Sequence, residues 1–223
     1  MIKTQVLVRR KAGMTREAFA DYWLGTHVAI TAKISKIRRQ TISIVRSDLQ
    51  RADTPWDGLA NAWWDDAAAI ASARRGDAFR AMIEDEENFV DVSDRRPLVV
   101  VEINPLAPKV PPQPLPDRIK IVNPLFKLDA LSYQSFSDYW RGPHAALNNA
   151  LPNMHAYIQN HVHTDFRNAA RACDGIAESW FNSMDEIREL LRSEANVRLR
   201  EDEANLIKPG SLLPMVCREY RTI

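Results

Sequence analysis

A long internal repeat constrains the fold of this chain more than any other feature of its sequence. Three segments recur at one spacing of 117 positions: 19–27 as 136–144, 57–64 as 174–181, and 84–90 as 201–207. The first pair shares the pattern F-x-D-Y-W-x-G-x-H. Because all three pairs keep a single register, they indicate a tandem duplication, and the chain is expected to fold as two similar units.

The boundary between the two units is marked by proline. Residues 105–116 contain six prolines, a composition typical of a stiff and extended linker. We therefore predict an N-terminal domain over residues 1–104, a linker over residues 105–116 and a C-terminal domain over residues 117–223. Each unit is long enough to build its own core.

The charge and the cysteine content argue against several classes of function. The 223 residues carry a net charge of +1, whereas nucleic-acid binding needs a clear basic excess to neutralise phosphates. The two cysteines, Cys173 and Cys217, have neither metal nor redox spacing, which fits a reduced compartment. There is no apolar run of membrane-spanning length and no signal-peptide pattern. We expect a cytoplasmic protein that binds neither nucleic acid nor membrane.

Apolar periodicity and turn residues predict the same order of elements in each half: strand, helix, strand, strand, helix, strand. Strands are expected near 2–10, 37–46, 97–103, 154–163 and 214–221 and after the Asp-Gly pairs at 57 and 174, and helices near 15–33, 66–82, 132–151 and 184–200. This order is the ferredoxin-like pattern of an α+β protein. A four-stranded sheet with helices on one face leaves its other face bare, so the two sheets are expected to cover each other.

The repeated nine-residue pattern predicts a helix that breaks or kinks at its glycine. Gly25 and Gly142 stand where a helix can break or kink, and Pro143 suits the first turn of a new helical segment. His27 and His144 would then lie near a helix N-terminus, whose positive end disfavours protonation of the imidazole. A neutral histidine can accept a proton as a general base. The alternative is that each imidazole only braces the neighbouring glycine.

The second strand of the C-terminal half alternates polar and apolar side chains. Its polar positions are His155, Tyr157, Gln159, His161 and His163. The apolar face is expected to meet the helices, so the polar face is predicted to line the space between the two sheets. Glu178 and Trp180 share a face of the next strand and are expected to line the same space. The equivalent positions of the first half begin with Arg38, which is predicted to face this space as well.

The Tyr-Trp-x-Gly-x-His helix, followed by the Asp-Gly-Ile-Ala-Glu-x-Trp-Phe strand, resembles the EthD-like family of the dimeric α+β barrel superfamily. The resemblance implies that the two halves form, within one polypeptide, the barrel that other members make by dimerising. It also implies a small, partly apolar cavity that acts on a ring compound or a conjugated acid. Members of the superfamily range over dehydratases, decarboxylases, isomerases, cofactor-free oxidases and haem proteins, so the resemblance names no single reaction. The histidine most often considered functional in the family corresponds to His27 and His144.

Residues that only the C-terminal half possesses carry the functional hypothesis. Four of them have no equivalent in the first half: His155, His161, His163 and Glu178. A histidine and a carboxylate that face one cavity suit proton abstraction next to a carbonyl and return of the proton elsewhere. We therefore predict a cofactor-independent isomerase or lyase, with ester or lactone hydrolysis as the nearest variant. Its substrate would be a small unsaturated or ring-derived carboxylic acid in aromatic catabolism. The predicted catalytic residues are His144, His161, His163 and Glu178.

A second set of side chains is predicted to hold the substrate. Arg38 would bind the substrate carboxylate in bidentate fashion, and Tyr157 and Trp180 would offer flat faces to a ring. The predicted substrate-binding residues are His27, Arg38, Tyr139, His155, Tyr157 and Trp180. The alternative for the arginine is an ordinary surface charge, and for the aromatic residues it is packing in the core.

Three other interpretations of the sequence stay open. The chain could be a non-catalytic binding or accessory protein of a degradation pathway, or an enzyme of cofactor-free or haem-dependent oxidation. His161 and His163, with His155 or Glu178, could also supply metal ligands from one strand face. The preferred hypothesis requires no metal and no organic cofactor. A small-molecule substrate is the expected partner, and the pseudo-dimers could associate further into a homo-dimer.

Overall fold

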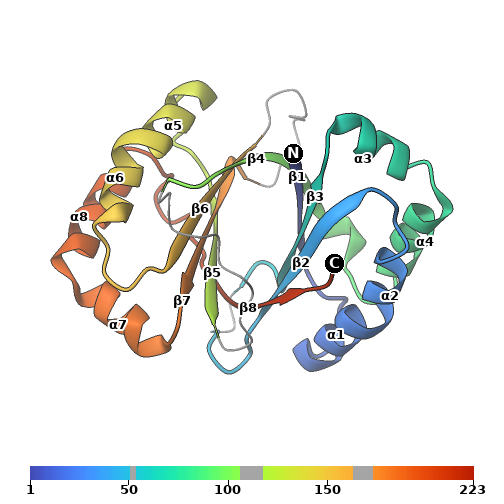
Figure 1. Ribbon diagram of the computed structural model, residues 1–223. Coiled ribbons are helices and arrows are strands. Elements are labelled where there is room, and N and C mark those ends of the chain that lie inside the picture. Colours follow the sequence, from blue (N-terminus) through green and yellow to red (C-terminus); the bar gives the residue numbers. More distant parts are fainter. Residues whose placement is uncertain (51–53, 106–117, 163–172) are drawn as a thin grey trace.

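The computed structural model describes residues 1–50, 54–105, 118–162 and 173–223, and this part of the chain forms one closed barrel of eight antiparallel strands (Figure 1). The strands are β1 (Ile2–Val8), β2 (Ile37–Val45), β3 (Gly58–Trp64), β4 (Arg96–Ile103), β5 (Ile119–Leu125), β6 (Ala156–Val162), β7 (Gly175–Phe181) and β8 (Met215–Arg221). Around the barrel they follow the order β1-β3-β2-β8-β5-β7-β6-β4. The predicted fold class, two ferredoxin-like repeats in one intramolecular barrel, is confirmed. Most of the predicted linker, 106–116, lies outside the described residues.

The last strand of each half pairs with a strand of the other half. β4 lies between β1 and β6, and β8 lies between β5 and β2. Val100 of β4 is therefore opposite Val162 of β6, and Ile44 of β2 is opposite Arg218 of β8. Because of this exchange, the two halves share one continuous hydrogen-bonded wall, and the barrel has no open strand edge.

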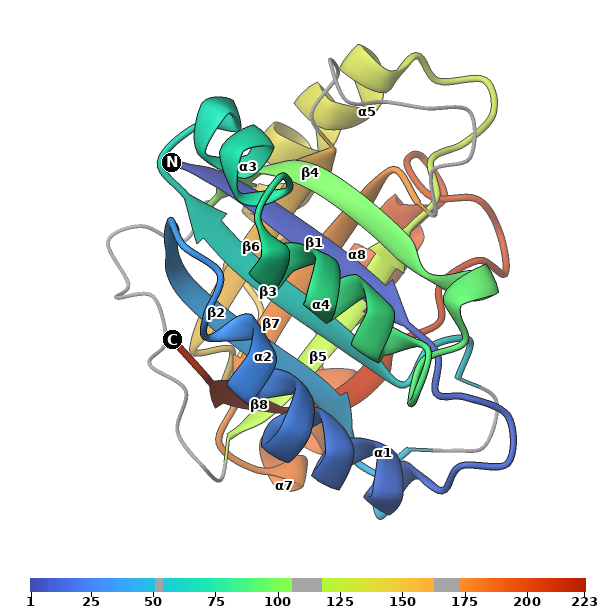
Figure 2. The same ribbon diagram turned by 90° about the vertical axis from the view of Figure 1, so that its right-hand side faces the viewer.

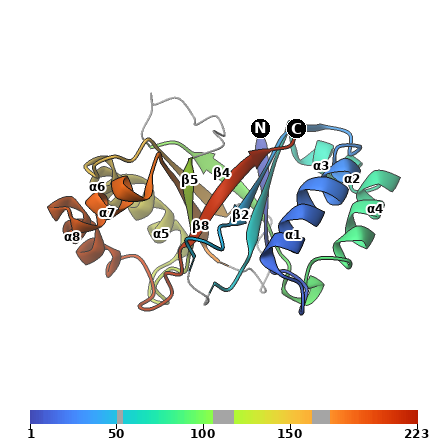
Figure 3. The same cartoon turned by 90° about the horizontal axis from the view of Figure 1, so that it is seen from below.

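Helices form an outer layer on each side of the barrel. The helices of the first half are α1 (Arg16–Tyr22), α2 (Val28–Thr31), α3 (Ala67–Ala73) and α4 (Asp77–Glu86), and those of the second half are α5 (Tyr133–Tyr139), α6 (Ala145–Asn149), α7 (Met184–Arg192) and α8 (Glu194–Glu203). Figure 2 looks onto the first layer, and Figure 3 shows the strands enclosed between the two layers. Within the described residues, no helix is both long enough and apolar enough to cross a membrane.

The helix that carries the repeated pattern does not break. α1 continues through a π-helical turn, η1 (Trp23–His27), into α2, and α5 continues in the same way through η3 (Trp140–His144) into α6. Of the two predicted possibilities, a break or a kink at Gly25 and Gly142, the break is therefore wrong. A π-helical turn holds one more residue than an α-helical turn, so the extra residue is accommodated in a wider turn and the helix continues. His27 and His144 consequently lie inside a helix and not at its N-terminus.

The second helix of each half is divided in two, where the sequence predicts one continuous helix. Gly76 is extended, with a ψ of 153°, and α4 begins directly after it. In the second half the hydroxyl of Ser193 accepts a hydrogen bond from the backbone N–H of Asn196 and caps α8. A glycine and a capping serine each start a new helix, because both stabilise an extended residue at its N-terminus.

Two of the repeated segments touch each other in the folded chain. The indole of Trp23 packs against Gly58 of β3, where an added Cβ would be 2.5 Å from its Cζ3. Trp140 and Gly175 repeat the contact in the second half. Glycine is required at both strand positions because a tryptophan occupies the space of a side chain.

The barrel interior holds a row of charges, of which Lys3, Lys120, Glu178 and Glu219 are buried and Glu102, at one end, is exposed. Nζ of Lys3 lies 2.9 Å from Glu102 and 3.2 Å from Glu178. Nζ of Lys120 lies 2.8 Å from Glu178 and 2.5 Å from Glu219. We call these five residues the charge ladder. Its alternating signs offset the large cost of removing the four buried charges from water.

The predicted orientation of the second C-terminal strand is wrong. Asn160 of β6 points into the barrel, where it donates to Glu178 and accepts from Lys3. Tyr157 and His161, which alternate with it, therefore point toward the helices. Every residue of β6 is buried, because helices cover one face and the barrel encloses the other. Polar and apolar side chains do alternate along β6, but polar partners are present on both sides of the strand, so the alternation did not show which side is inside.

Candidate functional site

A cavity of about 340 Å³ lies between the sheet and the helices of the N-terminal half. β1 to β4 form its floor, and η1, α2, α3 and α4 form its roof, the layer seen from outside in Figure 2. Its apolar lining includes Val6, Ile34, Trp64, Phe79, Met82 and Phe89. Its polar lining includes Thr31, Gln40, His27, Glu86, Arg95 and Arg74. A largely apolar cavity of this size with a few polar groups suits a small organic ligand.

His27, the last residue of η1, stands at the wall of this cavity. Its Nδ1 lies 2.8 Å from Oδ2 of Asp85, and the hydroxyl of Tyr22 donates to the other oxygen of the same carboxylate at 2.8 Å. The carboxylate favours the tautomer that carries the proton on Nδ1, which leaves a lone pair on Nε2. Within the described residues, Nε2 has no hydrogen-bond partner. Burial lowers the pKa of His27 despite the opposing effect of Asp85, so the imidazole is held neutral.

Glu86 supplies a second titratable group to the same cavity. It is 6% exposed and follows Asp85 directly in α4, and Nε of Arg95 lies 2.6 Å from its carboxylate. Burial raises the pKa of Glu86, and the charge of Arg95 opposes this shift. The cavity therefore joins a histidine and a carboxyl group that burial shifts in opposite directions, an arrangement found in acid–base sites.

The C-terminal half repeats the histidine and its partners. Nδ1 of His144 lies 2.8 Å from Oδ2 of Asp202, and the hydroxyl of Tyr139 donates to Oδ1 of Asp202 at 2.5 Å. The triad of tyrosine, histidine and aspartate is thus a property of both repeats. Tyr139, predicted to bind substrate, serves here as a partner of Asp202.

His161 does not share a cavity with Glu178. Its Nδ1 lies 2.9 Å from the hydroxyl of Ser137 and its Nε2 lies 3.1 Å from Oε1 of Gln159. Its ring packs on Trp140 with centroids 4.3 Å apart. Burial lowers the pKa of His161 to about 4. With both nitrogens engaged and one face covered, this histidine fits a packing role between sheet and helix.

The other predicted residues are dispersed. His155 lies near the surface, 3.1 Å from Glu186. Arg38 is exposed and pairs with Asp65, so its predicted position inside the barrel is wrong. The reason is the same as for β6, since the alternation in β2 places Thr41 and not Arg38 on the inner face.

Glu178 and Trp180 point into the barrel, where they contact members of the charge ladder. The Glu178 carboxylate is 1% exposed and bonds both lysines of the charge ladder. The indole of Trp180 donates to Glu219 at 3.2 Å. Tyr157 accepts a hydrogen bond from the indole of Trp140 on the helix side of the sheet. His163 lies outside the described residues.

The described residues contain no group of three or more histidine, cysteine, aspartate or glutamate side chains that could hold a metal ion. Of the possible ligand set, His163 lies outside the described residues, and the others are far from one another: His161 is on the helix side of the sheet, His155 near the surface and Glu178 in the barrel interior.

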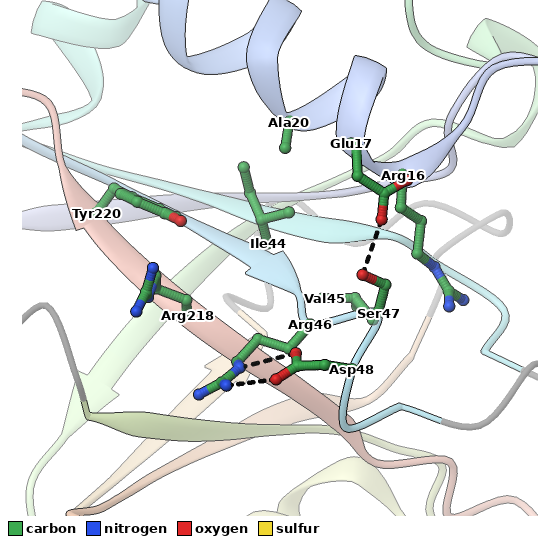
Figure 4. Close-up of a pocket in the computed structure, with 10 residues that line it drawn as sticks. All are labelled: Arg16, Glu17, Ala20, Ile44, Val45, Arg46, Ser47, Asp48, Arg218 and Tyr220. Atoms are coloured by element: carbon green, nitrogen blue, oxygen red, sulfur yellow. Dashed lines mark hydrogen bonds and ion pairs between the residues drawn. The ribbon is translucent and has the colours of Figure 1, made fainter.

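A second, shallower pocket of about 290 Å³ lies where β8 of the C-terminal half joins β2, beside α1 (Figure 4). Arg46 pairs with both carboxylate oxygens of Asp48, and Ser47 donates to Glu17 at 2.8 Å. Because these charged side chains pair with one another, this pocket is a weaker candidate than the N-terminal cavity.

The sequence interpretation missed Asp85 and Glu86. The sequence predicts helices that end near residues 82 and 200, whereas residues 84–86 and 201–203 form the last turns of α4 and α8. The signal that could have identified them was the repeat itself. Asp85 recurs as Asp202 at the same spacing as His27 and His144, and a solvated turn has no reason to keep a carboxylate in register.

Comparison with known proteins agrees with this architecture. The EthD domain model matches residues 11–93 and 128–210. The structure is similar to that of an anthrone oxidase-like protein (TM-score 0.67, 12% identity, 99% of this chain and 93% of the other). It is also similar to a mutant chlorite dismutase from Candidatus Nitrospira defluvii (TM-score 0.54, 11% identity, 97% and 90%). At these identities the likeness is one of fold. No curated protein matches the chain. Since the two matches cover more than half of the residues, the chain belongs to the EthD domain family, as a tandem duplication of that domain.

Proposed function

We propose that this chain is an enzyme that moves a proton on a small ring-derived or conjugated substrate bound in the N-terminal cavity. The observation that carries the proposal is the position of His27 at the wall of an apolar cavity, with Asp85 behind it and Glu86 in the same lining. This moves the proposed base from the C-terminal histidines of the sequence hypothesis to the first repeat.

In the proposed reaction, Nε2 of His27 accepts a proton from a carbon next to a carbonyl group. The electron pair of the broken C–H bond moves into the carbonyl, which becomes an enolate, and Asp85 stabilises the imidazolium that forms. In an isomerisation, the imidazolium then returns the proton to a different carbon. In an elimination, the imidazolium instead protonates the leaving group. An enclosed apolar cavity favours this chemistry, because charges interact more strongly there than in water.

Arg74 gives this cavity a place for an acidic substrate. It stands at the exposed rim, and within the described residues its guanidinium has no ion-pair partner. Arginine binds a carboxylate with two parallel hydrogen bonds. Arg74 is therefore the candidate for the role that the sequence hypothesis gave to Arg38.

Exchange of substrate hydrogen with solvent tests the proposal. A panel of cyclic ketones and unsaturated ring acids is incubated with the protein in deuterated water, and loss of the α-proton signal is followed by NMR. His27→Gln should slow exchange by at least about 100-fold, the usual contribution of a general base. His144→Gln is the matched control, since it removes the equivalent residue of the other repeat, and it should exchange at the wild-type rate. Loss of exchange in His144→Gln alone would contradict the proposal and favour the C-terminal half.

Cofactor-free oxidation is the second candidate, and the comparisons favour it over isomerisation or elimination. A structure that shares the fold bears the name anthrone oxidase-like protein. The first step would be the same deprotonation by His27, but the resulting anion would then be oxidised by molecular oxygen. Oxygen uptake separates the two. Consumption of oxygen together with substrate supports oxidation, and turnover at an unchanged rate under argon supports the proton-transfer enzyme.

A further inference from the structure

The two repeats differ in the hydrogen bonding of one indole N–H, that of Trp23 in the first half and of its equivalent Trp140 in the second. In the C-terminal half, Nε1 of Trp140 donates a hydrogen bond of 2.9 Å to the hydroxyl of Tyr157, which is buried. The donor and the acceptor therefore satisfy each other between the sheet and η3.

In the N-terminal half this acceptor is missing. Gln40 of β2 occupies the position of Tyr157, since both stand at the same register opposite β3 and β7. Its amide oxygen accepts hydrogen bonds from Thr31 at 3.2 Å and Thr222 at 3.0 Å. Within the described residues, Nε1 of Trp23 has no acceptor, and it is not among the fully enclosed unpaired atoms.

An indole N–H can only donate, so it has to be satisfied by an oxygen acceptor from outside the protein. Trp23 lines the same cavity as His27 and Gln40, and the remaining walls are mainly apolar. An accessible donor in an apolar wall selects ligands that place an acceptor opposite it, because a ligand without one leaves the donor unpaired.

We propose that the N-terminal cavity recognises ring compounds that carry a carbonyl oxygen, through a hydrogen bond from Nε1 of Trp23, and that residue 40 determines whether this donor is available. The ligand class rests on the function proposed for the same cavity, since the carbonyl would be the group that His27 activates. Trp23 would hold the carbonyl oxygen while its negative charge develops. In the C-terminal half, Tyr157 accepts the hydrogen bond of the equivalent donor, Nε1 of Trp140, so that donor is not available to a ligand. The two repeats of one duplication have therefore diverged in ligand binding.

Acetophenone and ethylbenzene provide a matched pair of probes, because they differ only in the carbonyl group. Their affinities are measured by NMR titration of the full chain, and the acetophenone-to-ethylbenzene affinity ratio is compared between variants. Trp23→Phe should lower this ratio about fivefold, the usual effect of losing one neutral hydrogen bond. Gln40→Tyr places a tyrosine beside Trp23, as Tyr157 lies beside Trp140 in the second repeat, so its hydroxyl should accept the indole hydrogen bond. It should lower the affinity ratio by a similar factor.

Two controls separate this inference from the proposed function. Tyr157→Phe changes only the C-terminal half and should leave the ratio unchanged. His27→Gln should abolish turnover but keep the ratio, so recognition can stand even if the proposed chemistry fails. The inference is overturned if the wild type binds neither probe, or if Gln40→Tyr keeps the wild-type ratio. Gln40→Tyr keeps the test decisive should Trp23→Phe fail to fold, since it leaves the tryptophan in place.

Discussion

Lys3 of β1 and Glu178 of β7 lie 3.2 Å apart inside the barrel, although 175 positions separate them in the sequence. The same carboxylate lies 2.8 Å from Lys120, the repeat equivalent of Lys3. One glutamate therefore joins the corresponding lysines of both halves. Each lysine also lies over the tryptophan of its own half, at 4.7 Å from the ring of Trp63 and 4.8 Å from that of Trp180.

Glu178→Gln should destabilise the protein by about 3–5 kcal/mol, because it leaves two buried ammonium groups without their shared counter-charge. The free energy of unfolding in urea measures the effect. Arg38→Ala is the control, since it breaks the exposed ion pair with Asp65 and should cost less than about 1 kcal/mol. Equal losses in the two variants would contradict a stabilising role for the charge ladder.

Acid should weaken the barrel through the same residue. Burial alone would raise the pKa of Glu178, but the charges of Lys120 and Lys3 lower it to about 2, from 4.5 in the unfolded chain. The unfolded state therefore takes up a proton first, and the stability that Glu178 contributes is complete above about pH 4.5 and lost as the pH falls toward 2. Urea midpoints at pH 6 and pH 3 test this. The difference in urea midpoint between wild type and Glu178→Gln should be smaller at pH 3 than at pH 6. An equal difference at both pH values would refute the dependence of stability on the protonation of Glu178.

Gly58→Ala should destabilise the N-terminal half by about 1–3 kcal/mol, the usual cost of forcing atoms into a packed core. The new Cβ would lie 2.5 Å from the indole of Trp23 and 2.9 Å from the backbone oxygen of Ser43. Gly25→Ala is the matched control, because nothing lies within 4 Å of its added Cβ and helical alanine is favoured by about 1 kcal/mol. Thermal unfolding of both variants measures the difference in stability. Equal unfolding temperatures would mean that Trp23 can move away from the new Cβ.

The rate of the proposed reaction should depend on the protonation of His27. Burial lowers its pKa from 6.5, so kcat/KM should rise with pH through an apparent pKa below 6.5, as the imidazole loses its proton. Asp85 opposes this shift, so Asp85→Asn should reduce the rate and also move the rise to lower pH. A pH–rate profile of each variant measures both effects. An unchanged profile in Asp85→Asn would show that another group is the base.

The fold was predictable because the repeat encodes it twice. Matching blocks fixed the register, and the alternation of apolar residues located the strands to within a few positions. The division of the second helix was missed because Gly76 and Ser193 act through local backbone conformation, which apolar periodicity does not report. The π-helical turns were missed for a similar reason, since a glycine indicates backbone freedom without saying how the chain uses it.

The candidate site was harder to predict, because the sequence shows alternation but not which side is inside. In β6 the polar face meets Ser137 and the backbone of Trp140, while Asn160 on the other face meets the charge ladder. Both choices satisfy the polar groups, so polarity could not decide between them. The pairing of His27 with Asp85 depends on the approach of α4 to η1, a tertiary contact that only the shared 117-residue spacing could have revealed.

The charge ladder shows what a fused chain can do that a symmetric pair of identical chains cannot. In a homodimer every position occurs twice across the two-fold axis, so a central glutamate would face its own copy and the two like charges would repel each other. Here the equivalent of Glu178 is Asn61, which accepts a hydrogen bond from Gln5 at 2.9 Å and carries no charge. Covalent linkage removes that symmetry, so one central carboxylate can bond both lysines, while Glu102 and Glu219 each bond one of them.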